Sequence, residues 1–176
     1  MKDIAYAVQQ AAKVLAPKGQ KVRLFVLGRG SEEAKPAFRE YLGNVNGVAV
    51  SVLGLLPAKK KIAEVLAQAD ALLFVRGHIS GRRTSAIAGI ACGLPVVAYE
   101  GVETGFPITE AGVWLAPQGD LEALSEGLCR VLTDESLWQA LHQRSVQAYR
   151  RYFSWDAIAN QFLKVLGNEV THDGRT

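Results

Sequence analysis

Apolar residues recur along this chain with two different spacings. Ile4, Val8, Ala11 and Leu15 stand three or four positions apart, which predicts an N-terminal helix that ends at the segment APKG. Unbroken apolar runs bounded by turn-forming or polar residues predict strands at 22–28, 48–54, 71–75, 95–99 and 112–117.

Helical spacing returns between and after these runs. It predicts helices at 58–70, about 84–93, 120–132, 135–153 and 154–166. Asp120 and Ser154 stand at the start of two of these segments. We expect both to be N-caps, because a short side-chain oxygen accepts hydrogen bonds from the amides of a helix's first turn.

Strands that alternate with helices indicate one α/β domain, expected at 1–168, followed by a disordered tail at 169–176. The nearly continuous apolar strands predict a parallel sheet flanked by helices on both faces. Ligands of such sheets bind beyond the carboxyl ends of the strands. We therefore expect a common rim formed by the loops at 28–31, 54–57, 76–85 and 100–105.

Composition narrows the function only slightly. The net charge of +3 is too small for a dedicated nucleic-acid binder but is compatible with a small anionic ligand. Cys92 and Cys129 lie in apolar helical patterns, so we expect reduced, buried thiols. No apolar run approaches the roughly 20 residues that span a bilayer, and the N-terminus lacks a signal-peptide pattern, so the sequence predicts a cytoplasmic protein.

The segment GRRTS at 81–85 carries the clearest candidate chemistry. A helix beginning here offers unpaired amides and a partial positive charge, which attract phosphate. Gly81 allows a close backbone approach, Arg82 and Arg83 are bidentate donors, and Thr84 or Ser85 can cap the helix or donate to an oxygen. The competing interpretation is a solvated loop. The small residues of the helix body (Ala86, Ala88, Gly89, Ala91 and Gly93) favour the anion site, because they let the helix approach the sheet closely.

The other candidates are weaker. Gly28 and Gly30 form a G-x-G pattern after a strand, which a tight turn explains better than a ligand contact does. His78 is a possible sugar contact or general acid, although a loop histidine more often has no such role. Lys59–Lys61 are expected to be a solvated helix start. No residues have metal-ligand spacing, and no catalytic nucleophile is visible.

Several segments, in this order and spacing, resemble one known protein family. The segments are VRLFVLGRGS, VLGLLP, IAEVLAQADALLFV, ACGLPVVAYEG, AGVWLAPQGDLEALSEGLCRVLTDESLWQAL and RRYFSWDAIANQFLKVL. The chain resembles, over about 4–168, the C-terminal Rossmann-like domain of retaining GT-B glycosyltransferases. That group 1, family 4 type includes sucrose and glycogen synthases and bacterial hexosyltransferases of polysaccharide biosynthesis. CGLPVV and FSWDAIA are the most specific parts.

The resemblance implies a donor-binding domain that holds a nucleotide-diphosphate sugar, with no cofactor and no metal. A helix N-terminus and basic side chains would neutralise the diphosphate, and Leu55–Leu56 would hold the nucleotide base mainly through main-chain atoms. The partner implied is an N-terminal acceptor domain of the same enzyme, toward which the helix at 154–168 would cross.

Two departures from the family qualify this interpretation. The family has two glutamates where this chain has Ser80 and Ala88, so their roles in binding donor sugar and ribose cannot be carried over. The acceptor domain is absent, and so is a strand that normally precedes the first helix and carries arginine and lysine. We therefore expect a fragment that binds donor weakly and transfers nothing. The alternative is a degenerate, non-catalytic binding or interaction module; a sugar-nucleotide epimerase would need carboxylates and histidines that are not found.

Overall fold

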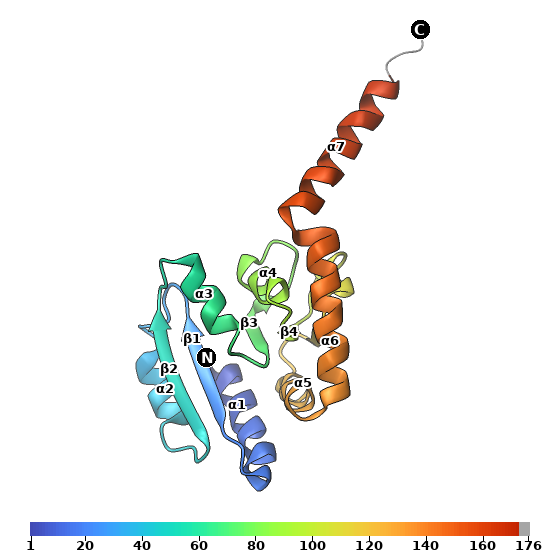
Figure 1. Cartoon of the computed structure of the whole chain (residues 1–176). Helices are drawn as coiled ribbons and strands as arrows, with labels where there is room; N and C mark the ends of the chain where they lie inside the picture. The colour runs from blue at the N-terminus through green and yellow to red at the C-terminus, as the bar shows by residue number, and fades with distance from the viewer. Residues whose placement is uncertain (173–176) are drawn as a thin grey trace.

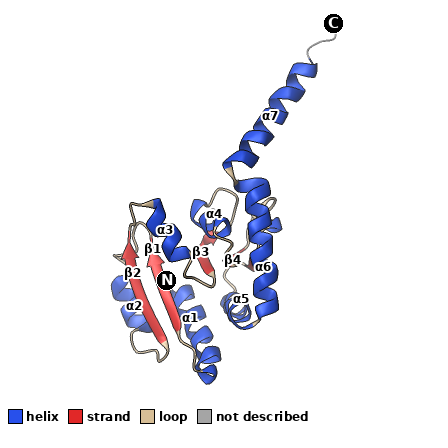
Figure 2. Ribbon diagram, viewed as in Figure 1, coloured by secondary structure: helices blue, strands red, loops and turns tan. Residues whose placement is uncertain are grey.

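The computed structural model describes residues 1–172, and it describes side chains as far as residue 166. The strands are β1 (Val22–Leu27), β2 (Val48–Gly54), β3 (Leu72–His78), β4 (Val96–Tyr99) and β5 (Val113–Ala116). The helices are α1 (Lys2–Leu15), α2 (Lys35–Leu42), α3 (Lys59–Leu66), α4 (Thr84–Ala91), α5 (Leu121–Thr133), α6 (Glu135–Ala148) and α7 (Trp155–His172). The order in space is shown in Figures 1 and 2.

All strand pairs of the described chain are parallel, which confirms the α/β class with helix-flanked parallel strands. The strands nevertheless form two ladders, β1–β2 and β3–β4–β5, so the expectation of one continuous sheet is wrong. Side chains connect the ladders in place of backbone hydrogen bonds. Val22 of β1 and Leu73 of β3 pack against one apolar cluster that includes Ala7 and Ala11 of α1.

The helix α2 was missed in the expected order of elements. Its segment KPAFREYL is rich in charged residues, yet Phe38 and Leu42 stand four positions apart and are almost fully buried. They pack with Ala5 and Val8 of α1. These tertiary contacts stabilise a helix that the short local pattern of apolar residues does not predict. Pro36 in the first turn is compatible with a helix start, because the amide that proline lacks would have no intrahelical partner there.

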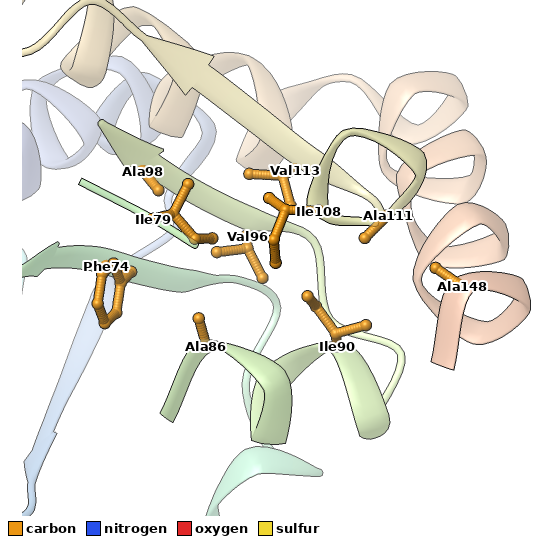
Figure 3. Close-up of a cluster of buried hydrophobic side chains, with 10 residues drawn as sticks. All are labelled: Phe74, Ile79, Ala86, Ile90, Val96, Ala98, Ile108, Ala111, Val113 and Ala148. Carbon is orange, nitrogen blue, oxygen red and sulfur yellow. The ribbon is translucent and has the colours of Figure 1, made fainter. Parts of the chain in front are cut away.

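The core of the second ladder holds the start of α4 in place. Ala86 and Ile90 of α4 are fully buried against Phe74 of β3, Val96 of β4 and Ile79 in the loop that follows β3. Figure 3 shows these side chains pointing toward one another between the helix and the strands. The apolar face of α4 is thus fixed on the sheet, and the position of its first turn follows from that packing.

Both predicted N-caps are confirmed. The Asp120 carboxylate accepts a hydrogen bond from the Ala123 amide at 2.9 Å, and the Ser154 hydroxyl accepts one from the Ala157 amide at 3.1 Å. The two cysteines are free thiols, as expected, but Cys92, the residue after α4, is exposed and Cys129 is only half-buried. The expectation of burial is therefore wrong for Cys92.

The helix α7 extends away from the rest of the molecule (Figure 1). Its apolar side chains are largely exposed, including Trp155, Phe162 and Leu163. The predicted tail at 169–176 overlaps the end of this helix at residues 169–172, and 173–176 lie outside the described residues.

Candidate functional site at the carboxyl edge of the strands

The loops predicted to form a common rim follow the carboxyl ends of β1, β2, β3 and β4. Parallel pairing places two of them together in each ladder. The amino ends of β1 and β3 also lie together, because Leu15 and Gln20 ahead of β1 line the same pocket as Asp70 ahead of β3. Since the two ladders begin at a shared edge, their carboxyl ends and the four loops lie toward the opposite edge.

The start of α4 is open to solvent at this edge. Arg83 is the N-cap residue, and Thr84 and Ser85 are the first two helical residues, both exposed. Neither hydroxyl caps the helix, so that part of the expectation is wrong. The Thr84 and Ser85 amides have no hydrogen-bond partner within the described chain. These donors and the helix dipole are suited to an oxyanion.

Among the small residues of α4, Gly89 has the expected role of letting the helix lie close to the sheet. A Cβ on Gly89 would stand 2.6 Å from Leu72 Cδ2, so any larger residue here would require the Leu72 side chain to move. Ala91, in contrast, is exposed. In the loop ahead of α4, Gly77 has a φ of 73°, a left-handed conformation that favours glycine. Gly81 does not have a positive φ. The conformation of Gly81 therefore does not itself require glycine, and its close approach to a ligand stays a prediction.

A carboxylate that sequence reasoning missed joins two of the predicted site residues. Glu103, in the loop after β4, accepts hydrogen bonds from Arg82 and from His78 Nε2, the latter at 3.2 Å. The hydrogen bond from His78, together with the nearby arginines, lowers the pKa of Glu103 although partial desolvation opposes this. Arg82 is 78% exposed and therefore free to exchange this partner for an anion.

Three buried polar atoms lack a hydrogen-bond partner in the described chain, and all three lie at the carboxyl edge. They are Ser80 Oγ and Arg83 Nε in the loop after β3, and Ser31 Oγ after β1. An unpartnered buried polar group costs about 1–3 kcal/mol, so its presence calls for a physical explanation. A bound oxyanion or an ordered water at Ser80 and Arg83 would supply the missing partner.

The loop after β4 is tied to the loop after β3 by Thr104, a second residue that sequence reasoning missed. Its hydroxyl donates to the Ile79 carbonyl at 2.7 Å and accepts from the Gly101 amide at 3.0 Å. Both loops had been assigned to the rim, but nothing in the local pattern pairs these positions, which are 25 residues apart. The tie fixes the backbone immediately ahead of Ser80.

Gly28, Gly30 and the Leu55–Leu56 pair follow the strands of the first ladder, and the structure shows no contact between them and the residues around the start of α4. Gly28 and Gly30 have φ values of 110° and 80°, which favour glycine and agree with the turn interpretation. Leu55 is 65% exposed and Leu56 is half-buried, both after β2. Ala88, at the position of a family glutamate, is half-buried in α4.

One pocket of the structure does not coincide with the candidate site. A pocket of about 510 Å³ lies at the opposite, amino edge, lined by residues such as Lys18, Thr133 and Trp138. No three His, Cys, Asp or Glu side chains in the described part of the chain are arranged to hold a metal ion. No described helix combines the length and apolar character that crossing a membrane requires.

Comparison with known proteins decides the family. The sequence model described as "Glycosyl transferases group 1" matches residues 1–134, from α1 to the end of α5. This chain belongs to that family. The group 1 match contains the CGLPVV segment and the whole candidate site. The FSWDAIA segment, on which the resemblance also drew, lies beyond the matched residues.

A curated relative supports the same family. The chain is 29% identical over 143 residues to "Amylovoran biosynthesis glycosyltransferase AmsK" of Erwinia amylovora. The aligned region covers 77% of this chain but 34% of that protein, so this chain spans about a third of the length of its relative.

Proposed function

We propose that this chain is the donor-binding, C-terminal part of a glycosyltransferase that uses a nucleotide-diphosphate sugar. The diphosphate would bind at the start of α4, near Ser80, Arg82 and Arg83. Thr84 and Ser85 would donate from their amides or hydroxyls, and His78 would contact the sugar. The acceptor, the sugar and the nucleotide base are open, and Leu55–Leu56 with Gly28 and Gly30 are the proposed surroundings of the nucleotide.

The proposal is supported chiefly by one observation: the unpartnered polar atoms gather beside an open helix start. Ser80 Oγ and Arg83 Nε are buried donors without acceptors, and the Thr84 and Ser85 amides are two more donors. A diphosphate is an acceptor-only group with several oxygens, so it would complement this set. Arg82, held by Glu103, could turn to the ligand as a further cation.

The same features suggest how transfer could proceed without a metal. A positive helix end and two guanidinium groups would stabilise the negative charge that develops on the departing diphosphate. The acceptor would be held by another domain of the same enzyme, toward which the exposed apolar face of α7 would extend. We expect no turnover by the chain alone, because a closed cleft needs groups from both sides. The cytoplasm is the proposed compartment, since both cysteines are free thiols.

Calorimetric titration of UDP, GDP and ADP, with and without attached hexoses, tests the binding site. We expect one nucleotide to bind the wild-type chain and to lose about tenfold or more in affinity in the Arg82→Ala/Arg83→Ala variant, because charge-assisted hydrogen bonds are lost. Lys59→Ala/Lys60→Ala is the matched control, as it removes two exposed cations from the start of another helix. Equal affinity in all three proteins would end the proposal.

The substitutions at the family glutamate positions favour a second candidate, a non-catalytic binding module. Ser80 and Ala88 provide no carboxylate at either position. The two candidates differ in the activity of a longer protein that contains this chain and an acceptor domain. Transfer that is abolished by Arg82→Ala/Arg83→Ala supports the enzyme; nucleotide binding with no transfer to any acceptor supports the module.

A further inference from the structure

An irregularity in β3 places His78 at the carboxyl edge of the strands. Phe74 and His78 of β3 pair with two consecutive residues of β4, so the residues between them form a bulge. Gly77, inside this bulge, has a positive φ. Bulges re-aim side chains and occur often beside active sites. The bulge brings the imidazole of His78 next to the end of β4 and to the loop that follows it.

The loop after β4 packs on His78 and presents Glu103 to it. A Cβ on Gly101 would stand 2.6 Å from His78 Cβ, so the backbone of this loop lies directly on the histidine. On the other side of Glu103, the Thr104 hydroxyl holds the loop to the Ile79 carbonyl. The Glu103 carboxylate is thus fixed between two anchored positions, with Oε2 at 3.2 Å from His78 Nε2.

Arg82 is held less firmly than the carboxylate that it contacts. Its side chain is 78% exposed, whereas that of Glu103 is 38% exposed and keeps a second partner in His78. Exposed ion pairs contribute little to stability, while hydrogen bonds from arginine to phosphate are charge-assisted and often bidentate. A diphosphate at the start of α4 would therefore take Arg82 and leave the carboxylate in place, with one oxygen free to accept another donor.

The carboxylate beside His78 has the chemistry of a sugar contact. The hydrogen bond with His78 and the neighbouring arginines lower the pKa of Glu103, so the group is ionised at neutral pH and only accepts hydrogen bonds. Sugar hydroxyls can donate, whereas a diphosphate only accepts. In a nucleotide-diphosphate sugar, the sugar is bonded directly to the second phosphate. An oxygen that Arg82 leaves for the diphosphate would therefore lie next to the sugar.

We propose that Glu103, positioned by His78, recognises the donor sugar by accepting hydrogen bonds from its hydroxyls once Arg82 has turned to the diphosphate. This inference rests on the proposed function and names the substrate class, a nucleotide-diphosphate sugar whose sugar carries no negative charge. A hexuronic acid would bring a second carboxylate toward Glu103, and like charges placed together in a binding site disfavour the complex.

The same residue separates the donor from the nucleoside diphosphate that transfer leaves behind. A nucleoside diphosphate takes Arg82 from Glu103 and offers the carboxylate no hydroxyl in return. A nucleotide-diphosphate sugar replaces the lost partner. The attached sugar should therefore increase affinity, and this increase should depend on the charge of Glu103.

Calorimetric titration tests the inference with whichever of UDP, GDP and ADP binds, with its glucose, galactose and mannose conjugates, and with the corresponding uronic acids. We expect one hexose conjugate to bind the wild-type chain more tightly than the free diphosphate and about tenfold or more tightly than its uronic acid. Glu103→Gln should reduce the ratio of hexose-conjugate to diphosphate affinity by about tenfold and bring hexose and uronic acid within about threefold of each other. Glu110→Gln, which removes another exposed carboxylate between β4 and β5, is the matched control and should change neither ratio.

The outcomes separate this inference from the proposed function. If Glu103→Gln raises the affinities for diphosphate and hexose conjugate equally, the carboxylate acts on Arg82 alone and the inference is wrong. Uronic acids that bind the wild-type chain as tightly as the hexoses would also overturn it. Both results leave the proposed function standing, provided that Arg82→Ala/Arg83→Ala still weakens nucleotide binding. If no nucleotide binds the wild-type chain, the proposed function fails and this inference fails with it.

Discussion

Two buried serines of this chain should respond to alanine substitution with opposite signs. Ser80 is 3% exposed, and its hydroxyl has no partner in the described structure. Ser145 is fully buried, and its hydroxyl donates to the Leu94 carbonyl at 2.9 Å. The residue type and the substitution are the same, so the comparison isolates the effect of the hydrogen-bond partner.

The magnitudes follow from the cost of an unsatisfied group. Burying a hydroxyl without a partner costs about 1–3 kcal/mol, so Ser80→Ala should stabilise the ligand-free protein by about 1 kcal/mol once the small cavity is counted. At this chain length that raises Tm by about 2–4 °C. Ser145→Ala leaves the Leu94 carbonyl unsatisfied and should lower Tm by at least about 2 °C.

Although Ser80→Ala should stabilise the ligand-free protein, it should weaken the binding of a diphosphate ligand. If its hydroxyl donates to a diphosphate, removing that charge-assisted bond costs about 1.5–3 kcal/mol, or roughly 10–100-fold in affinity. Thermal melts and calorimetric titration with UDP, GDP and ADP measure both quantities, and Ser145→Ala should leave the affinity unchanged. A lowered Tm for Ser80→Ala would show that the hydroxyl is already satisfied in the free protein. Unchanged affinity would remove Ser80 from the site.

Further predictions concern the exposed carboxylate and the helix contact. Glu103→Gln should raise affinity for a nucleoside diphosphate about two- to fivefold at pH 7, because Arg82 loses its competing partner; unchanged or weaker binding would contradict this. The pKa of Glu103 lies below its ordinary value of 4.5, so the carboxylate stabilises the fold above about pH 4.5 and this contribution is lost as pH falls through the lowered pKa. The melting difference between wild type and Glu103→Gln should therefore vanish in acid, and a difference that grows there would refute the assignment. Gly89→Val should destabilise the protein by about 1–3 kcal/mol, because the Leu72 side chain occupies the space that the valine would need. The control Ala91→Val, on the exposed side of α4, should cost well under ~1 kcal/mol. Equal melting temperatures for the two variants would exclude a tight contact between α4 and β3.

Much of the architecture could be read from local pattern. The apolar runs located all five strands, and Asp120 and Ser154 were recognised as N-caps, because period and capping depend on residues within a few positions. The exposed start of α4 beside Arg82 and Arg83 was likewise predictable. In α2, where the apolar stripe is short and charged residues surround it, the local signal was too weak and packing against α1 decided the element.

The sequence by itself determined the α/β class, the order of the elements apart from α2, and the segment on which cationic and hydroxyl groups gather. Only the tertiary structure decided that Glu103 holds Arg82 and His78, that Thr104 ties two loops together, and that Ser80 Oγ is buried without a partner. It also decided that the strands form two ladders. The physical reason is that helix and strand patterns repeat over a few residues, whereas the partner of a polar atom depends on every segment that folding brings within hydrogen-bond distance.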